Sequence, residues 1–231
     1  MHELEKFIVV LLMGTDGHRP VQLLMIVPGE GGVGKSHTIQ AISNNFKQKG
    51  MENALAKGAF MGIAATLIGG KTLHVLAQLL IKGSKQSKRG YKKLVATWQD
   101  KLYLIIDEMS MISCQMLARV SNALTIAKKL AGIEGEHKLF RGINIILVGD
   151  FHQFPPVFGR PLYWRLDNRV ADEEDLLGWS IYKQFRTVVR LKQQMRVVDS
   201  EWLDMLQHVR NGNCGARHLD ILHSVTISSG F

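Results

Sequence analysis

Apolar runs and stretches with helical spacing alternate along the chain. Four runs with the length and composition of strands lie at residues 22–27, 54–60, 102–106 and 143–148. Two sets of residues after the first and third runs each share one helical face: Ile39, Ile42 and Phe46, and then Met116, Val120 and Leu124. This alternation predicts an α/β fold with a mainly parallel sheet. Residues 102–106 and 143–148 are apolar throughout, so we expect helices on both faces of the sheet.

The pattern changes near residue 187, where we predict that a second unit begins. Residues 187–191 (TVVRL) have strand character, and residues 199–212 predict a helix. The expected N-cap of this helix is Asp199 or Ser200, and the residues expected on its inner face are Trp202, Leu206 and Val209. The predicted division is therefore 1–186 for the first domain and 187–231 for a short part of a second.

A strongly basic segment interrupts the first domain at residues 82–93. It carries six cations, Lys82, Lys85, Lys88, Arg89, Lys92 and Lys93, with no apolar period. We predict a loop here. A charge run of this kind is usually only solvated, and the alternative is a surface that follows nucleic-acid phosphates.

Net charge narrows the class of partner more than bulk composition does. The 46% of hydrophobic residues is ordinary for a globular protein with a real core. The formal net charge of +9 and the isoelectric point near 9.6 favour an anionic partner, either nucleic acid or an anionic membrane surface.

Cysteine count and the N-terminal run indicate a compartment. Cys114 and Cys214 are too few for a disulfide framework and match no zinc-ligand spacing, so a reducing intracellular environment is expected. The run FIVVLLMG at residues 7–14 is too short to cross a bilayer and lacks a basic leader. We expect a core helix there rather than a signal peptide, and a protein that is not secreted.

A phosphate-binding motif follows the first apolar run. The stretch GEGGVGKS fits the pattern G-x-x-x-x-G-K-S/T and comprises Gly29, Glu30, Gly31, Gly32, Val33, Gly34, Lys35 and Ser36. Backbone N–H groups of such a loop surround phosphate oxygens, the lysine supplies a charge to the β- and γ-phosphates, and the Ser36 hydroxyl can bind Mg²⁺. A plain glycine-rich turn is the alternative. The position between a predicted strand and a predicted helix favours an ATP site.

Two acids and a glutamine follow later strands. Asp107 is placed to hold Mg²⁺, and Glu108 to polarise the attacking water. The stretch GDFHQFPPV (149–157) begins where another buried strand ends. Because loops at the carboxyl ends of parallel strands line the ligand crevice, Gln153 is a candidate sensor of the γ-phosphate. A surface loop bounded by prolines is the alternative.

Taken together, these motifs resemble one family, the petite-integration-frequency (PIF) DNA helicases of superfamily one, especially their helitron-transposon-like branch. The resembling stretches are GEGGVGKS, MGIAATLIGGKTLH (61–74), LIIDEMSMI (104–112), GDFHQFPPV and LKQQMR (191–196). The resemblance implies a RecA-like P-loop NTPase domain that couples hydrolysis of ATP, with Mg²⁺, to 5′-to-3′ movement on single-stranded DNA. It also implies roles in DNA repair, recombination and telomere maintenance, in the nucleus or mitochondrion, without a membrane.

The resemblance also assigns roles to residues. Glu108 would be the catalytic base, Gln153 the γ-phosphate sensor and Arg196 an arginine that reaches the γ-phosphate. The DNA track would include Gly62, Thr72 and His74, and residues 82–100, with Lys88 and Arg89, would be the small duplex-separating insertion.

Three departures from the family pattern set further expectations. No glutamine precedes Gln22 to read adenine, and Met61 stands where the family has a threonine. Later motifs of the second motor domain are absent, so we expect no scaffold that directs Arg196. A missing arginine finger costs about 10³ to 10⁵ in kcat, so we expect nucleotide binding without useful unwinding unless a second RecA-like domain or another copy acts in trans.

Two other functions remain open at this point. One is a degenerate transposon relic that binds nucleic acid, or nothing, without catalysis. The other is a P-loop ATPase that does not move DNA, such as a switch or an assembly factor.

Overall fold

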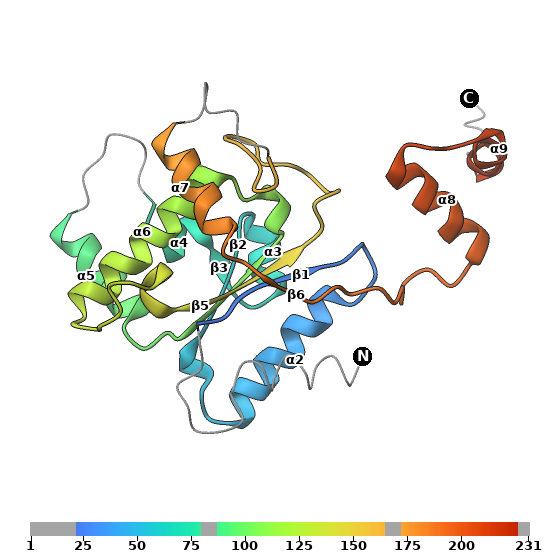
Figure 1. Cartoon of the computed structure of the whole chain (residues 1–231). Helices are drawn as coiled ribbons and strands as arrows, with labels where there is room; N and C mark the ends of the chain where they lie inside the picture. The colour runs from blue at the N-terminus through green and yellow to red at the C-terminus, as the bar shows by residue number, and fades with distance from the viewer. Residues whose placement is uncertain (1–21, 80–86, 165–171, 226–231) are drawn as a thin grey trace, which may run out of the picture.

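The computed structural model describes residues 22–79, 87–164 and 172–225 (Figure 1). The core helix predicted at residues 7–14 lies outside this part of the chain, and so does the first half of the basic segment.

Six strands form one parallel sheet in the order β3-β2-β4-β5-β1-β6. Their bounds are β1 Leu24–Pro28, β2 Leu55–Ala59, β3 Lys71–Thr72, β4 Tyr103–Asp107, β5 Asn144–Gly149 and β6 Thr187–Val188. The four apolar runs each form a strand within two residues of the expected bounds. The predicted α/β class with a parallel sheet is confirmed.

Helices cover both faces of the sheet, as the apolar strands required (Figure 1). The longer helices are α2 Lys35–Gln48, α5 Lys88–Trp98, α6 Cys114–Leu130, α7 Glu173–Tyr182, α8 Ser200–Asn211 and α9 Ala216–Val225. On one face, Leu104 and Ile145 pack with α5, α6 and α7, while on the other Ile105 and Ile146 pack with α2. Successive strand side chains point to opposite faces, so each strand contributes to both cores.

Short elements complete the domain between these helices and strands. They are α3 Gly62–Leu67, α4 Leu73–Leu76 and the 3-10 turns η1 Glu52–Ala54, η2 Met109–Met111 and η3 Leu139–Gly142. Gly70 explains part of the GGKTLH stretch, because a Cβ there would lie 2.4 Å from the backbone oxygen of Lys57 on β2. The second glycine of this pair therefore allows the chain that leads from α3 into β3 to pass closely along β2.

The structure corrects the prediction for the basic segment. Residues 88–93 are not a loop but the first half of α5. Ser87 caps this helix by accepting a hydrogen bond from the Gly90 N–H. Leu94 and Trp98 lie on the inner side of the helix and are buried. The charges are concentrated on the outer side, which hid the helical period.

Two predictions about the C-terminal part are also corrected. β6 pairs with β1, so the strand expected to start a second domain at residue 187 completes the first sheet instead. Asp199 caps α8 as predicted, but its buried residue is Met205, whereas Leu206 and Val209 are exposed. The inner face of α8 is set by its neighbours in the fold, which periodicity alone does not identify.

The carboxyl ends of the strands meet at one edge of the sheet. Pro28 is in register with Gly149, and Ala59 with Asp107. The loops that follow β1, β2, β4 and β5 therefore emerge side by side, which is where open α/β sheets place their ligands.

Candidate nucleotide-binding site

The loop between β1 and α2 has the geometry of a phosphate cradle. Gly32 and Gly34 adopt left-handed backbone angles, with φ of 86° and 89°, which glycine adopts without strain. Lys35 is the first residue of α2, and its Nζ donates hydrogen bonds to the carbonyl oxygens of Gly29 at 2.9 Å and Glu30 at 2.8 Å. Its ammonium group is thus held inside the loop that phosphates would occupy.

Charges from the ends of β4 and β5, and from the segment after β6, surround this lysine. Burial lowers the pKa of Lys35, while the negative charges of Asp150, Glu108 and Asp107 partly oppose that effect. Arg196 is close enough to lower the pKa further by repulsion. The sheet edge therefore brings one half-buried cation together with three carboxylates.

The two predicted acids lie at the end of β4 in a constrained turn. Asp107 is buried, and its Oδ1 accepts a hydrogen bond from the Glu108 N–H at 2.9 Å. Glu108 has φ of 53°, a left-handed conformation that a glutamate seldom adopts. Strain of this kind, on the order of 1 kcal/mol or more, is found mostly at functional sites.

Burial raises the pKa of both acids. For Asp107 the hydrogen bond from Glu108 and the charge of Lys35 only partly offset the burial. For Glu108 the neighbouring charge of Asp107 adds to the burial, and Lys35 opposes both. In the protein alone, the positive charge of Lys35 does not fully offset the burial of these two carboxylates.

Such a carboxylate fits the requirements of a Mg²⁺ ion. Mg²⁺ is usually bound by one or two carboxylates together with substrate phosphates. Asp107 supplies an undercompensated carboxylate, and Ser36 supplies a hydroxyl in the first turn of α2. Both donors are oxygens, which is the ligand type that Mg²⁺ prefers.

Gly149 is necessary for the position of the acid turn. A Cβ at this residue would lie 2.7 Å from the backbone nitrogen of Met109, which follows Glu108. Its φ of 152° is also unfavourable for other residues. The glycine that ends β5 therefore makes room for the turn that ends β4.

Asp150 and Arg210 are site residues that the sequence analysis missed. The Arg210 guanidinium on α8 donates two hydrogen bonds to the Asp150 carboxylate, at 2.5 and 2.6 Å, and lies 3.6 Å from Glu30 of the phosphate loop. Burial raises the pKa of Asp150, but the hydrogen bonds from Arg210 and from the His152 N–H, with the charges of Arg210 and Lys35, outweigh it and lower the pKa.

Of these two residues, only Asp150 could have been identified from the sequence. Asp150 directly follows an apolar strand, as Asp107 ends one, so the same rule would have selected it. Arg210 is a single arginine in a helix with no motif around it, and only the fold brings it to the phosphate loop.

The segment that carries Arg196 packs directly against the phosphate loop. Gln194 Nε2 donates to the Gly31 carbonyl, and the Met195 N–H donates to the Gly32 carbonyl, both at 2.9 Å. A Cβ on Gly32 would lie 2.7 Å from the Cβ of Arg196. β6 and this segment therefore attach Arg196 to the first domain, which the sequence analysis did not expect, and its contact with the γ-phosphate stays a prediction.

A polar cavity of about 500 Å³ lies beside the phosphate loop. Its walls come from the loop, from Asp150 to His152, from residues 190–194 and from α8. The cavity thus lies between the phosphate-loop edge of the sheet and α8. Figure 1 shows α8 and α9 beyond an extended segment that passes the loop after β1.

The remaining predicted residues lie at or beyond the edges of this site. Gln153 is exposed in the turn after β5, where its N–H donates to the Asp150 carbonyl. Gly62 begins α3, and Thr72 caps α4 by accepting from the Val75 N–H. Exposed His74 makes an edge contact with Phe60. Their predicted roles stay predictions.

Lys88 and Arg89 are not brought to the nucleotide residues. They occupy the first turn of α5 and are exposed. Figure 1 shows α5 at the end of the molecule away from the loop between β1 and α2. A role in DNA binding would therefore be separate from the nucleotide site.

Comparison with known proteins assigns this arrangement to a family. The family profile described as PIF1-like helicase matches residues 16–219. The chain belongs to the PIF1-like helicase family. The ATP-dependent DNA helicase PIF1 of Candida albicans is 30% identical over 199 residues, which cover 80% of this chain and 20% of that protein. The ATP-dependent DNA helicase Pif1 of Bdellovibrio bacteriovorus is 32% identical over 206 residues, which cover 86% of this chain and 42% of that protein.

Solved structures of this family share the fold. The crystal structure of Pif1 helicase from Candida albicans matches with a TM-score of 0.70 and 26% identity, covering all of this chain and 49% of that one. Pif1 helicase from Bacteroides, in complex with ADP-AlF3 and single-stranded DNA, matches with a TM-score of 0.67 and 23% identity, covering 100% of this chain and 51% of that one. The chain therefore spans about half the length of these PIF1-like structures, and less of the two relatives compared by sequence.

In the part of the chain that the structure describes, no helix combines the length and the apolar character needed to cross a bilayer.

Proposed function

We propose that this chain is the ATP-binding motor portion of a DNA helicase that uses ATP hydrolysis to move on single-stranded DNA. The observation that carries the proposal is the meeting of Lys35 with Asp107, Glu108 and Asp150 at one sheet edge of a PIF1-like chain. Movement in the 5′-to-3′ direction, and roles in DNA repair, recombination and telomere maintenance, are part of the proposal by family resemblance.

Phosphoryl transfer requires mainly positioning and neutralisation of charge, and the residues of the site are suited to both. Lys35 would exchange the loop carbonyls for the β- and γ-phosphates. Glu108 would orient and deprotonate the attacking water, and its raised pKa makes it a stronger base than an exposed glutamate. Gln153 and Arg196 would contact the γ-phosphate from the loop after β5 and the segment after β6.

Ser36 and Asp107 would hold Mg²⁺. The ion, when bound, supplies positive charge next to the transferred phosphate. The buried Asp107 carboxylate, whose pKa is raised in the protein alone, supports this assignment.

The proposal that the chain binds DNA rests on its net charge and on the stretch MGIAATLIGGKTLH (61–74). A net charge of +9 favours a polyanion, and the related Bacteroides Pif1 was crystallised with single-stranded DNA. Gly62, Thr72 and His74 would line the DNA track after β2. Lys88 and Arg89 would form a separate phosphate contact on α5.

The test is ATP binding and turnover by the purified chain, with and without single-stranded DNA. Lys35→Ala should weaken ATP binding on the order of 10- to 100-fold, because a charged hydrogen-bond donor contributes about 1.5–3 kcal/mol. Lys47→Ala is the matched control, since this lysine lies exposed near the other end of the same helix and should leave binding unchanged.

Three outcomes distinguish the parts of the proposal. Turnover that rises with DNA and is lost in Lys35→Ala supports all of it. Turnover that ignores DNA would overturn the motor assignment and leave an ATPase. No nucleotide binding by the native chain would refute the function altogether and favour a relic.

A further inference from the structure

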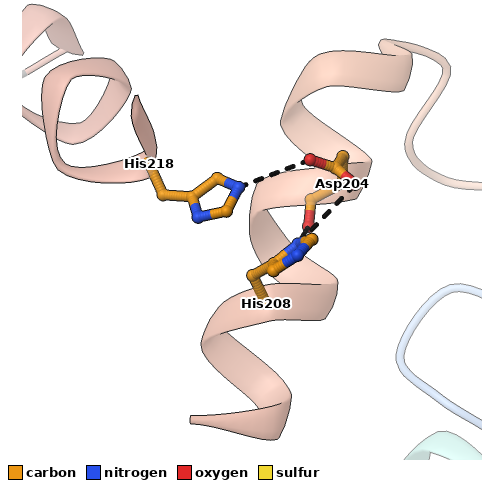
Figure 2. Close-up of side chains that lie close together, drawn as sticks. All are labelled: Asp204, His208 and His218. Atoms are coloured by element: carbon orange, nitrogen blue, oxygen red, sulfur yellow. Dashed lines mark hydrogen bonds and ion pairs between the residues drawn. The ribbon is translucent and has the colours of Figure 1, made fainter. Parts of the chain in front are cut away.

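Two histidines and one aspartate converge between the C-terminal helices, away from the phosphate loop. Figure 2 shows Asp204 and His208 one turn apart on α8, with His218 reaching toward them from α9. One ring nitrogen of each histidine and one carboxylate oxygen lie within 4.8 Å of one another. The two imidazole rings are 4.2 Å apart between centroids and tilted by 32°.

The distances between these possible ligand atoms are close to those between the ligands of a bound metal ion. Asp204 Oδ2 lies 3.4 Å from His218 Nε2, and Asp204 Oδ1 lies 3.6 Å from His208 Nδ1. Ligands at 2.0–2.1 Å in tetrahedral geometry are about 3.3 Å apart, as follows from typical Zn–N and Zn–O bond lengths. Small side-chain movements would bring the three donors to that spacing.

The present hydrogen bonds define what an ion would replace. His208 Nδ1 lies 2.9 Å from the Asp204 carbonyl, so this nitrogen carries a proton and donates it. His218 Nδ1 accepts from the Gly215 N–H at 3.0 Å, so in the neutral ring Nε2 carries the proton and faces Asp204. An ion would take the place of these two N–H groups.

Both rings can then move their proton to the opposite nitrogen. In His208 that nitrogen belongs to a side chain about one-third exposed, where water can accept the proton's hydrogen bond. In His218 the change costs the bond from Gly215, whose N–H is then free to bond to water because Gly215 is exposed. The cost is three hydrogen bonds, those of His208 Nδ1, His218 Nε2 and the Gly215 N–H, against two nitrogen–metal bonds.

A metal ion between α8 and α9 would stabilise the packing of two helices that bury few side chains. Among the described side chains of α8 and α9, only Met205 and His218 are buried. The ion pair between Arg217 and Glu201 also joins them, but both side chains are mostly exposed, and such pairs add little. Small helical units with few buried apolar groups commonly depend on a metal or another cross-link.

We propose that Asp204, His208 and His218 bind one divalent transition-metal ion, Zn²⁺ in the first instance, which fastens α9 to α8. Two imidazoles and a carboxylate suit Zn²⁺, Ni²⁺ or Cu²⁺ and do not suit Mg²⁺, which prefers oxygen ligands. Three protein ligands leave a fourth position for water. This site is separate from the nucleotide site and does not depend on the proposed function.

The test is metal binding by the full chain without an affinity tag, in excess Mg²⁺. Zn²⁺ is titrated against a chromophoric chelator, and Co²⁺ is used to record the visible spectrum of the bound ion. The native chain should bind one Zn²⁺ ion more tightly than any further Zn²⁺ ions. His208→Ala, His218→Ala and Asp204→Asn should each weaken binding at least tenfold, since even loss of a group that only supports a ligand typically costs 10- to 100-fold.

Because the chain has nine histidines, a matched control is necessary. His223→Ala removes an exposed histidine from α9 and should leave the affinity unchanged. Zn²⁺ should also slow tryptic cleavage after Arg217 in the native chain but not in Asp204→Asn, whose helix content is verified by circular dichroism. Equal affinity in the ligand variants and the control, or no bound ion in the native chain, would overturn the proposal.

Discussion

The ion pair between Arg210 and Asp150 is the contact that joins α8 to the phosphate-loop edge, and its removal should be measurable. The perturbation is Arg210→Met, which keeps most of the aliphatic stem and removes the guanidinium. Asp150 would then remain with a side chain that is 4% exposed and with one hydrogen bond, from the His152 N–H. The remaining carboxylate would be a poorly compensated buried charge.

The magnitude follows from the degree of burial. Exposed pairs contribute about 0.2–1 kcal/mol, and removal of one partner of a fully buried pair costs about 3–5 kcal/mol. Here Asp150 is buried and the Arg210 side chain is 24% exposed, and two short hydrogen bonds connect them. We expect Arg210→Met to lower the free energy of unfolding by about 2–3 kcal/mol. In a cycle with Asp150→Asn, the coupling free energy should be about 2 kcal/mol.

The effect of pH has a definite sign. The pKa of Asp150 is lowered in the folded protein, so its ion pair stabilises the fold at pH values above the ordinary pKa range of a carboxyl group. That stabilisation is lost as pH falls through the lowered pKa. The difference between the native chain and Arg210→Met should therefore be largest near neutral pH and should decrease in acid.

The assay is urea unfolding of the four proteins of the cycle, measured at neutral and acidic pH. Arg217→Met is the matched control, because its ion pair with Glu201 joins α9 to α8 and is exposed, and its loss should change stability little. Coupling below about 0.5 kcal/mol, or a loss independent of pH, would refute the reasoning from burial.

Two further predictions concern the acid turn. Asp107→Asn should raise the melting temperature of the nucleotide-free chain while weakening Mg²⁺-dependent ATP binding, because an acid whose folded pKa is raised destabilises the fold above that pKa; a lower melting temperature in scanning calorimetry would contradict this. Gly149→Ala should cost about 1–3 kcal/mol and reduce ATP turnover, because its Cβ would displace the Met109 backbone that follows Glu108. Gly132→Ala shares the positive φ but has open space around it, so a matching loss of turnover in that variant would show that the close contact is not the cause.

Much of the fold was readable because its signals are local. Strands covered on both faces are nearly continuous apolar runs, so 102–106 and 143–148 could be identified without knowledge of their partners. The phosphate loop was readable for a similar reason, since its glycines, lysine and serine lie within eight consecutive residues. The basic first half of α5 was misread because four cations concealed a capped helix that rests on Leu94 and Trp98.

Tertiary structure decided what depends on distant residues. Sequence alone indicated a strand at 187–191, but only pairing with β1 showed which sheet it joins. Likewise, Arg210 meets Asp150 across 60 residues, and His218 meets Asp204 from another helix. Backbone propensity and hydrophobic period arise from neighbours along the chain, so sequence determined the four long strands and the phosphate loop. Long-range packing selects among many possible partners, so only the folded chain decided which charges share a site.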